Sequence, residues 1–265
     1  MILLPEKYYH KLRAQVANID FNNLFAQAVV DRLVSGRIYV DDIGDPKTYY
    51  IVHRYGMSLL GGACTNEKFN RTFFDYVINK FKTRTEVEWM QVFPAEWNDI
   101  LKWPGLELNT RVNFTFDKSR YLDFRIKMAP DGLISVKKIN RSLFDSMNGS
   151  VVPKMFWNSF EDFDKKGIGF SLFYNNELAA TSFSSFLAPG KLELGIETLP
   201  SFRSRGLAER VCSVLIDYCI DHGLEPLWAC RLENTGSYIL ARKLGFVDTK
   251  QMAYYKVNTN PENTV

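Results

Sequence analysis

The sequence predicts a mixed α/β protein built from two domains. Its 265 residues are more than a single small domain needs, and they suit two domains of about 100 to 150 residues each. Strand-like runs alternate with runs of helical spacing along the whole chain. Glycine, asparagine and proline separate these runs at regular intervals in the second half. We therefore expect a smaller N-terminal α/β domain over residues 1–118 and a second domain over residues 119–265.

Composition argues against several classes of protein. Hydrophobic residues make up 46% of the chain and charged residues 24%, so an ordered core is expected. The net charge of +3, without any long run of like charges, argues against a nucleic-acid partner. No stretch is long and apolar enough for a membrane span, and Pro5 and Glu6 interrupt the apolar start. With four cysteines and no CxxC pair, the chain is predicted to be cytoplasmic.

The first domain is predicted to contain a helix over 20–33, strand-like runs at GRIYVDD and TYYIVHRYGMSLLGG, and an aromatic helix over 66–81. The runs WMQVF and RVNFTFD follow as further strands. Many of the aromatic residues have two open interpretations, as core residues or as the lining of an acceptor cleft. These residues are Tyr49, Tyr50, Tyr55, Trp89, Trp97 and Trp103.

The second domain is predicted to follow the order β-α-α-β-β-β-α-β-α-β. Pro153 and Gly167 mark the two ends of one helical stretch. Asn175 and Asn176 join two strand runs, because asparagine tolerates the positive φ angles of a tight hairpin. Apolar residues then recur every three or four positions from Leu207 onward, which predicts a helix up to the stop signal at Gly223. The strand PLWAC, a short helix SYILARKLG and the strand MAYYKV complete the order.

The loop TLPSFRSRGLAERVC connects a predicted strand directly to this helix. The first N–H groups of such a helix have no partners within it, and the helix dipole places partial positive charge beside them. Arg203 and Arg205 add charge, and Gly206 allows a ligand to approach the backbone because it has no Cβ. The loop therefore predicts an anion site suited to a pyrophosphate. The alternative is an ordinary turn with solvated arginines.

The R-x-x-G-x-A pattern at Arg203, Gly206 and Ala208 is preceded by ETLP and followed, after a strand, by ENTGSYILARKLGF. This set resembles the acyl-CoA-binding motifs of the GNAT (GCN5-related) N-acetyltransferase superfamily. It is similar in particular to the branch that includes zwittermicin A resistance acetyltransferases, in which a divergent N-terminal domain comes first. The resemblance implies a mixed, mostly antiparallel central sheet flanked by helices in the second domain.

The resemblance also implies a function. Acetyl-CoA would be the co-substrate and an amine, such as an aminated antibiotic, the acceptor; a non-catalytic acyl-CoA sensor or interaction module is the alternative, and a homodimer is compatible with either. The backbone of the strand would hold the pantetheine arm, the loop the pyrophosphate, and Asn234 the thioester end. The implied cofactor-binding residues are Ile196, Glu197, Thr198, Arg203, Ser204, Arg205, Gly206, Leu207, Ala208, Asn234 and Ser237.

Acetyl transfer to an amine requires a base, because an amine with a pKa near 10 is neutral in only about one molecule per thousand at pH 7. Glu193 and Glu197 share one strand face about 13 Å apart if the strand is regular, whereas a bulge would change that facing. Glu197, nearer the loop, is the first candidate for the base, and Glu233 is the second. The alternative for the strand carboxylates is that both are simply solvated.

Many relatives place a tyrosine seven residues after the asparagine as the general acid, and here that position is Ala241. Tyr238 is the candidate substitute, although it lies about 60° away around the helix. Cys212, Cys219 and Cys230 are predicted to be core residues because they lie in apolar runs. No metal-binding or serine-nucleophile motif is present, so no metal site is expected.

Overall fold

The computed structural model describes residues 1–128 and 130–260. The chain forms two compact units. Unit 1 contains Met1–Arg111, Arg231–Glu233 and a segment that starts at Gln251; unit 2 contains Val112–Cys230 and Asn234–Lys250. The first break lies near the predicted boundary between 118 and 119. A single boundary cannot describe the rest, because β13 (Phe246–Val257) ends by pairing with β5 (Glu88–Phe93) of unit 1.

Unit 1 is built on antiparallel strands followed by one parallel connection. β2, β3 and β4 pair antiparallel, and β5 then pairs parallel with β4, with α3 connecting them. In the described residues, the sheet has eight strands in the order β1-β2-β3-β4-β5-β13-β6-β12. The bounds are β1 Ile2–Leu3, β2 Gly36–Val40, β3 Thr48–His53, β4 Met57–Gly62, β6 Leu106–Phe116 and β12 Ala229–Arg231, with helices α1 Arg13–Ala17, α2 Leu24–Val30, α3 Glu67–Val77 and α4 Trp97–Ile100.

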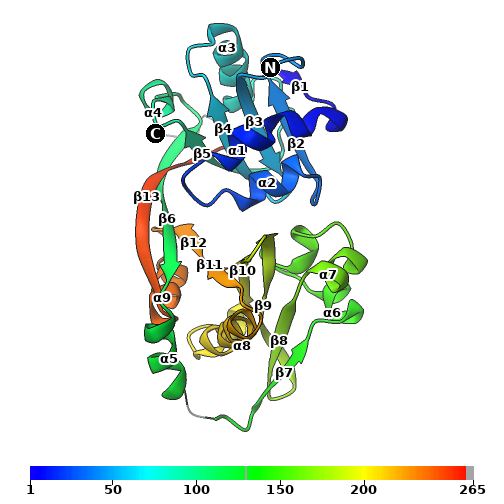
Figure 1. The fold of residues 1–265 in the computed structure, drawn as a ribbon, viewed down its shortest axis with the longest axis vertical. Helices are drawn as coiled ribbons and strands as arrows, with labels where there is room; N and C mark the ends of the chain where they lie inside the picture. The colour runs from blue at the N-terminus through cyan, green and yellow to red at the C-terminus, as the bar shows by residue number, and fades with distance from the viewer. Residues whose placement is uncertain (129, 261–265) are drawn as a thin grey trace. The chain divides into compact units, whose positions relative to one another are not determined.

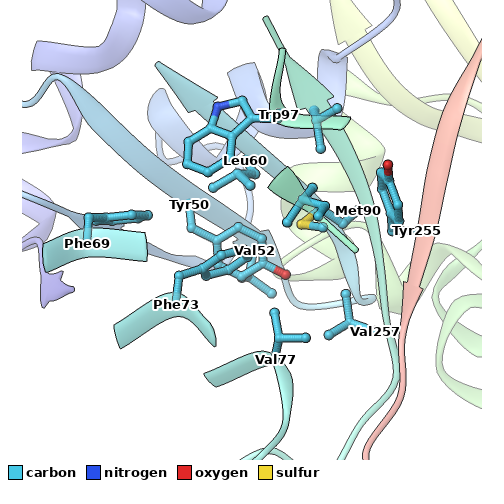
Figure 2. Packing of buried hydrophobic residues seen from close by; sticks show 12 residues of the cluster. Tyr50, Val52, Leu60, Phe69, Phe73, Val77, Met90, Trp97, Tyr255 and Val257 are labelled. Atoms are coloured by element: carbon cyan, nitrogen blue, oxygen red, sulfur yellow. The ribbon is translucent and has the colours of Figure 1, made fainter. Parts of the chain in front are cut away.

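One core cluster of unit 1 lies between α3 and the sheet, as Figure 2 shows. Phe69, Phe73 and Val77 recur every fourth residue on α3 and are buried, which confirms the helical spacing seen in the sequence. The predicted continuation of the helix to Phe81 is wrong. The helix ends at Val77, Asn79 takes a positive φ of 51°, and Phe81 is 69% exposed.

The structure decides the role of three of the six aromatic residues that the sequence left open. Tyr49, Tyr50 and Trp97 are fully or almost fully buried and belong to the core. Tyr55, Trp89 and Trp103 are only partly buried.

Unit 2 contains a sheet that has five strands in the described residues, in the order β11-β10-β9-β8-β7. All neighbouring pairs are antiparallel except β10 with β11, so the sheet is mostly antiparallel, as predicted. Asn175 and Asn176 form the β8–β9 turn with φ values of 50° and 66°, which confirms the predicted hairpin. The bounds are β7 Ile134–Lys138, β8 Gly169–Tyr174, β9 Glu177–Ala188, β10 Lys191–Thr198 and β11 Glu225–Leu227, with helices α5 Lys118–Ile126, α6 Arg141–Ser146, α7 Phe160–Lys166, α8 Leu207–Asp221 and α9 Thr235–Lys243.

Helix α8 packs on this sheet (Figure 1), with Leu207 and Val211 against Leu172 and two alanines of β9. Cys212 and Cys219 lie on its buried face, and burial raises the pKa of each thiol to about 12. These cysteines are therefore core residues, as the sequence predicts. No helix in the described part of the chain has the length and apolar composition needed to cross a membrane.

Candidate functional site

Strands β10 and β11 part after a short parallel pairing. In the described residues, the two strands pair over three residues only, with Lys191 to Glu193 opposite Glu225 to Leu227. β10 continues to Thr198, paired with β9 on its other side. The run predicted as one strand, PLWAC, divides here: β11 ends at Leu227, and β12 joins the other sheet. In the described residues, no strand pairs with the second edge of β10 beyond Glu193, so its backbone groups can hydrogen-bond an extended ligand.

Beyond this edge, α8 begins without a side-chain cap. Its N-cap is Gly206, which takes the left-handed conformation with φ 71° and ψ 7°. The fourth N–H of α8, that of Arg210, donates to the carbonyl of Gly206 at 3.4 Å. Among the described residues, the first three N–H groups of α8 have no acceptor, so they can donate to an external one at the positive end of the helix dipole.

The space beside this helix end is open. A Cβ built on Gly206 would come near only one neighbouring atom, Glu209 Oε2, at 3.9 Å. Ser204 also has a positive φ, of 60°, so the loop turns twice within three residues. Backbone N–H groups in such left-handed turns form concave anion sites. This geometry suits a phosphate group, and the pyrophosphate site stays a prediction.

The two arginines of the loop are held by neighbours and remain exposed. Arg203 donates from Nε to the carbonyl of Thr198 at 3.1 Å, and its Nη2 lies 3.5 Å from Glu197 Oε1. The Arg205 guanidinium lies over the ring of Phe202, 5.5 Å from its centroid. Both cations therefore lie on the loop that leads into α8, where they favour an anion.

Glu197 holds the turn at residues 149–151. Its Oε2 accepts hydrogen bonds from the backbone N–H of Ser150 and Val151 and from the Ser150 hydroxyl, at 3.0 to 3.2 Å. Its side chain is 14% exposed. Both carboxylate oxygens of Glu197 thus have donors beside them, Arg203 included. This role was not visible in the sequence, because Ser150 and Glu197 are 47 residues apart.

The other strand carboxylate, Glu193, is only 6% exposed. A register shift occurs beside it, as considered from the sequence, but the extra residue is Ser185 in β9. β10 itself stays regular, so the side chains of Glu193 and Glu197 lie on the same face of the sheet. Ser185 donates its hydroxyl to the Glu193 carbonyl at 3.0 Å.

At the start of α9, Asn234 serves as the N-cap. Its Oδ1 accepts from the N–H of Ser237 at 3.3 Å, and the Ser237 hydroxyl accepts from Trp228 Nε1 at 3.1 Å. Asn234 and Ser237 therefore lie together at one helix end, and Asn234 is an exposed residue. Glu233 belongs to unit 1, where its Oε1 accepts from the N–H of Thr110 at 2.9 Å.

Tyr238 donates its hydroxyl to Asp248 Oδ2 at 2.8 Å. This hydrogen bond, with a smaller contribution from burial, raises the pKa of Tyr238. Ala241, at the position where many relatives have tyrosine, is fully buried in the core. The face of α9 that would carry the usual acid therefore packs inward in this chain.

Comparisons with known proteins agree with this geometry. The family model for GNAT acetyltransferase matches residues 15–255. An uncharacterized N-acetyltransferase of Bacillus subtilis (strain 168), YdfB, is 27% identical over 261 residues, which cover 95% of this chain and 97% of that protein. The crystal structure of a GCN5-related N-acetyltransferase-like protein from Streptococcus suis 89/1591 has a TM-score of 0.71 at 19% identity, covering 95% of this chain and 99% of that one.

A tandem GNAT protein from the clavulanic acid biosynthesis pathway has a TM-score of 0.63 at 10% identity and covers 98% of both chains. At such low identity, these structures show the shared fold, whereas the family model covers most of the sequence itself. The chain belongs to the GNAT acetyltransferase family, whose members are acetyl-transferring enzymes that use acetyl-CoA as co-substrate.

Proposed function

We propose that this enzyme moves the acetyl group of acetyl-CoA directly onto the amine of a small acceptor. The observation that carries the proposal is the uncapped start of α8, with Gly206 in the left-handed conformation, next to the open edge of β10. A diphosphate with an extended amide-bearing arm requires both features: N–H groups for its phosphates and a strand edge for its arm.

The residues that would hold acetyl-CoA are those at these two features and at the start of α9. The open backbone edge from Leu194 to Thr198 would bond the amides of the pantetheine arm. The loop from Arg203 to Ala208 would enclose the pyrophosphate, with Arg203 and Arg205 supplying charge. Asn234 and Ser237 would meet the cofactor near its thioester, since the amide of Asn234 keeps donors to offer.

When bound, acetyl-CoA supplies an acetyl thioester, which a neutral amine attacks to give an amide and a free thiol. The chain's task is to remove one proton from the amine. We place Glu233 ahead of Glu197 in this role. Glu233 is exposed and accepts a single backbone hydrogen bond, whereas Glu197 is engaged by Ser150, Val151 and Arg203. Glu197 then serves as a positioning residue for the 149–151 turn.

No general acid is required for the leaving group. A thiol with a pKa near 8.5 leaves readily as its anion, and solvent then returns the proton. Tyr238 retains its proton and donates it in a hydrogen bond to Asp248, and its raised pKa makes it a weak acid at neutral pH. We therefore expect Tyr238→Phe to change the rate little.

The acceptor is proposed to be a small amine, and an aminated antibiotic is one molecule of this class. A non-catalytic acyl-CoA sensor differs from this proposal in one measurable respect. An enzyme releases free thiol and forms an acetylated product when acetyl-CoA and an amine are both present, whereas a sensor binds acetyl-CoA without turnover.

The test is a thiol-release assay over a panel of primary amines, with product masses measured in parallel. Glu233→Gln should lower kcat/KM by about 100-fold at pH 7, and the loss should shrink as the pH approaches the pKa of the amine, where no base is needed. Glu197→Gln should lower the rate equally at every pH. Binding of acetyl-CoA without thiol release from any amine would contradict the proposal.

A further inference from the structure

The guanidinium of Arg205 lies over two aromatic rings beside the start of α8. It is 5.8 Å from the ring centroid of Tyr174 and 5.5 Å from that of Phe202. The two rings meet edge to face, with centroids 6.4 Å apart and planes 61° apart. Both rings also pack against the apolar cluster that contains Leu207 and Val211 of α8. The rings therefore hold the Arg205 side chain on the α8 face of the unit 2 sheet.

Arg203 reaches toward the other face of the same sheet. It donates to the Thr198 carbonyl, and its guanidinium lies beside Glu197. Ile196 packs against the α8 cluster, and side chains alternate along a strand, so Glu197 lies on the face away from α8. The two arginines of the loop thus diverge, and each is placed to meet a different anionic group.

Arg205 also differs from Arg203 in its charge partners. Arg203 lies 3.5 Å from a carboxylate oxygen of Glu197, whereas in the described part of the chain no carboxylate forms an ion pair with Arg205. A guanidinium lying over a ring keeps its N–H groups in its own plane, where they match two oxygens of a phosphate. The rings therefore orient the exposed Arg205 without neutralising its charge.

Acetyl-CoA has a second anionic group in addition to its diphosphate. This group is the phosphomonoester on the 3′-oxygen of its ribose, and such a group carries close to two negative charges at neutral pH. The pantetheine arm and the adenosine are attached to opposite ends of the diphosphate. If the arm lies along β10, the adenosine end therefore leaves the start of α8 in another direction. Arg205 reaches toward Tyr174, the last residue of β8, which β9 separates from β10.

We propose that Arg205, oriented by Tyr174 and Phe202, binds the 3′-phosphate of acetyl-CoA, so that the protein distinguishes thioesters of CoA from those of dephospho-CoA. This inference rests on the proposed position of the diphosphate at the start of α8. The guanidinium donates two N–H groups to the phosphomonoester. Arg203 acts on the diphosphate, which both kinds of thioester contain.

The first experiment compares acetyl-CoA with acetyl-dephospho-CoA, which lacks only the 3′-phosphate, by calorimetry at one fixed salt concentration. Wild-type protein should bind acetyl-CoA at least about 10-fold more tightly, as expected for a charge-assisted pair of hydrogen bonds. Arg205→Gln should reduce this preference to near unity and leave the affinity for acetyl-dephospho-CoA unchanged. Arg203→Gln should weaken both ligands alike and retain the preference. Arg210→Gln, which removes a positive charge one turn into α8, should also retain it.

Further variants separate the charge of Arg205 from its orientation. Arg205→Lys keeps the charge but loses the planar fork, so it should retain only part of the preference. Tyr174→Phe keeps the ring and should retain the whole preference. Tyr174→Leu removes the ring that orients the guanidinium and should reduce the preference. The thermal midpoint of each variant, with its affinity for acetyl-dephospho-CoA, shows whether it is folded.

The outcomes separate this site from the other proposals. Equal affinity of wild-type protein for the two thioesters, or an unchanged preference in Arg205→Gln, would overturn the 3′-phosphate site; acetyl transfer stands if amines are still acetylated. If the preference depends on Arg205 but no amine is acetylated, the 3′-phosphate site stands and the acetyl-transfer proposal fails. If wild-type protein binds neither thioester, the 3′-phosphate site and the diphosphate site are both overturned.

Discussion

Helices α3 and α8 occupy equivalent places in the two units. In unit 1, antiparallel β2, β3 and β4 are followed by α3 and the parallel strand β5; in unit 2, antiparallel β8, β9 and β10 are followed by α8 and the parallel strand β11. The sequences of the two connections share no motif. The comparison therefore shows that the same topology can start its helix with a side-chain cap or without one.

The two helix starts differ in what meets their free N–H groups. Asn66 caps α3 by accepting from the N–H of Phe69 at 3.0 Å, and its own amide donates to Asp41 Oδ2 at 3.0 Å. The chain thus supplies a side-chain cap at α3 and places a carboxylate next to it. At α8 the cap is Gly206, which has no side chain to offer. The positive end of α8 is left for a ligand.

The parallel strand pairs beside the two helices also differ, in how many residues they pair. β4 and β5 pair over five residues, from Met57 opposite Trp89 to Gly61 opposite Phe93, whereas β10 and β11 pair over three. Trp97 closes the end of β4, since its Nε1 donates to the Gly62 carbonyl at 3.1 Å. In the described residues, the connection of unit 1 is therefore closed by strand pairing and side chains, whereas that of unit 2 leaves the proposed binding edge of β10 without a paired strand.

The substitution with the largest expected effect fills the open space at the start of α8. Gly206→Glu places a side chain and a negative charge at the proposed phosphate site, so the affinity for acetyl-CoA should fall by at least about 100-fold in calorimetry. Gly190→Glu is the matched control, because Gly190 has a similar φ of 72° in an exposed turn with nothing near its Cβ position. Equal losses in both variants would assign the effect to backbone strain and refute the anion site.

A smaller effect is expected from the loop arginines. Arg203→Gln and Arg205→Gln should each weaken acetyl-CoA binding by about 10-fold, close to the energy of one charge-assisted hydrogen bond. The loss should diminish as salt concentration rises, because both side chains are exposed. Arg210→Gln, one turn into α8, provides a comparison. If neither loop variant changes the affinity for acetyl-CoA, the arginine side chains do not contribute and the backbone N–H groups alone bind the phosphates.

At α3 the same kind of change should affect stability alone. Asn66→Ala removes the cap and should lower the free energy of unfolding by about 1 kcal/mol, measured by urea titration. The affinity for acetyl-CoA should not change. Asn70→Ala, one turn further along α3, separates capping from other effects, since Asn70 donates instead to the Cys64 carbonyl. A loss of acetyl-CoA affinity in Asn66→Ala would contradict the claim that the start of α3 affects stability alone.

The smallest effect concerns a buried carboxylate in unit 1. Glu88 is 2% exposed and accepts hydrogen bonds from Tyr50 and Tyr76, and burial raises the pKa of Glu88 overall. A raised pKa favours the protonated form in the folded state. The stability it contributes is full below the unfolded pKa of about 4.3 and is lost as pH rises through the folded value.

Glu88→Gln should therefore gain stability relative to wild type as pH rises from about 4 to 7, while acetyl-CoA affinity stays constant. Urea titrations across this range measure the difference, and Glu86→Gln, at the nearby Glu86 outside β5, is the control. Parallel stability curves for Glu88→Gln and wild type would show that the Glu88 carboxylate has no net preference for its protonated form.

Much of the second half could be predicted from sequence because its signals are local. The asparagine hairpin, the strand that leads into α8 and the stop at Gly223 all depend on φ preferences and hydrogen bonds within a few residues. The prediction that α3 continues to Phe81 failed because helical spacing alone does not reveal the left-handed turn at Asn79. Capping by Asn66 could have been found from its place before Glu67 and Phe69.

The sequence by itself determined the motif Arg203–Ala208, the uncapped start of the helix after it and the acetyltransferase family, since each depends on residues close together in the chain. Only the tertiary structure decided that Glu197 holds Ser150, that Ala241 faces the core, and that Arg205 lies over the ring of Tyr174. These contacts join residues far apart in sequence, and strand pairing and burial determine which side chains meet. Local preferences carry no information about such partners.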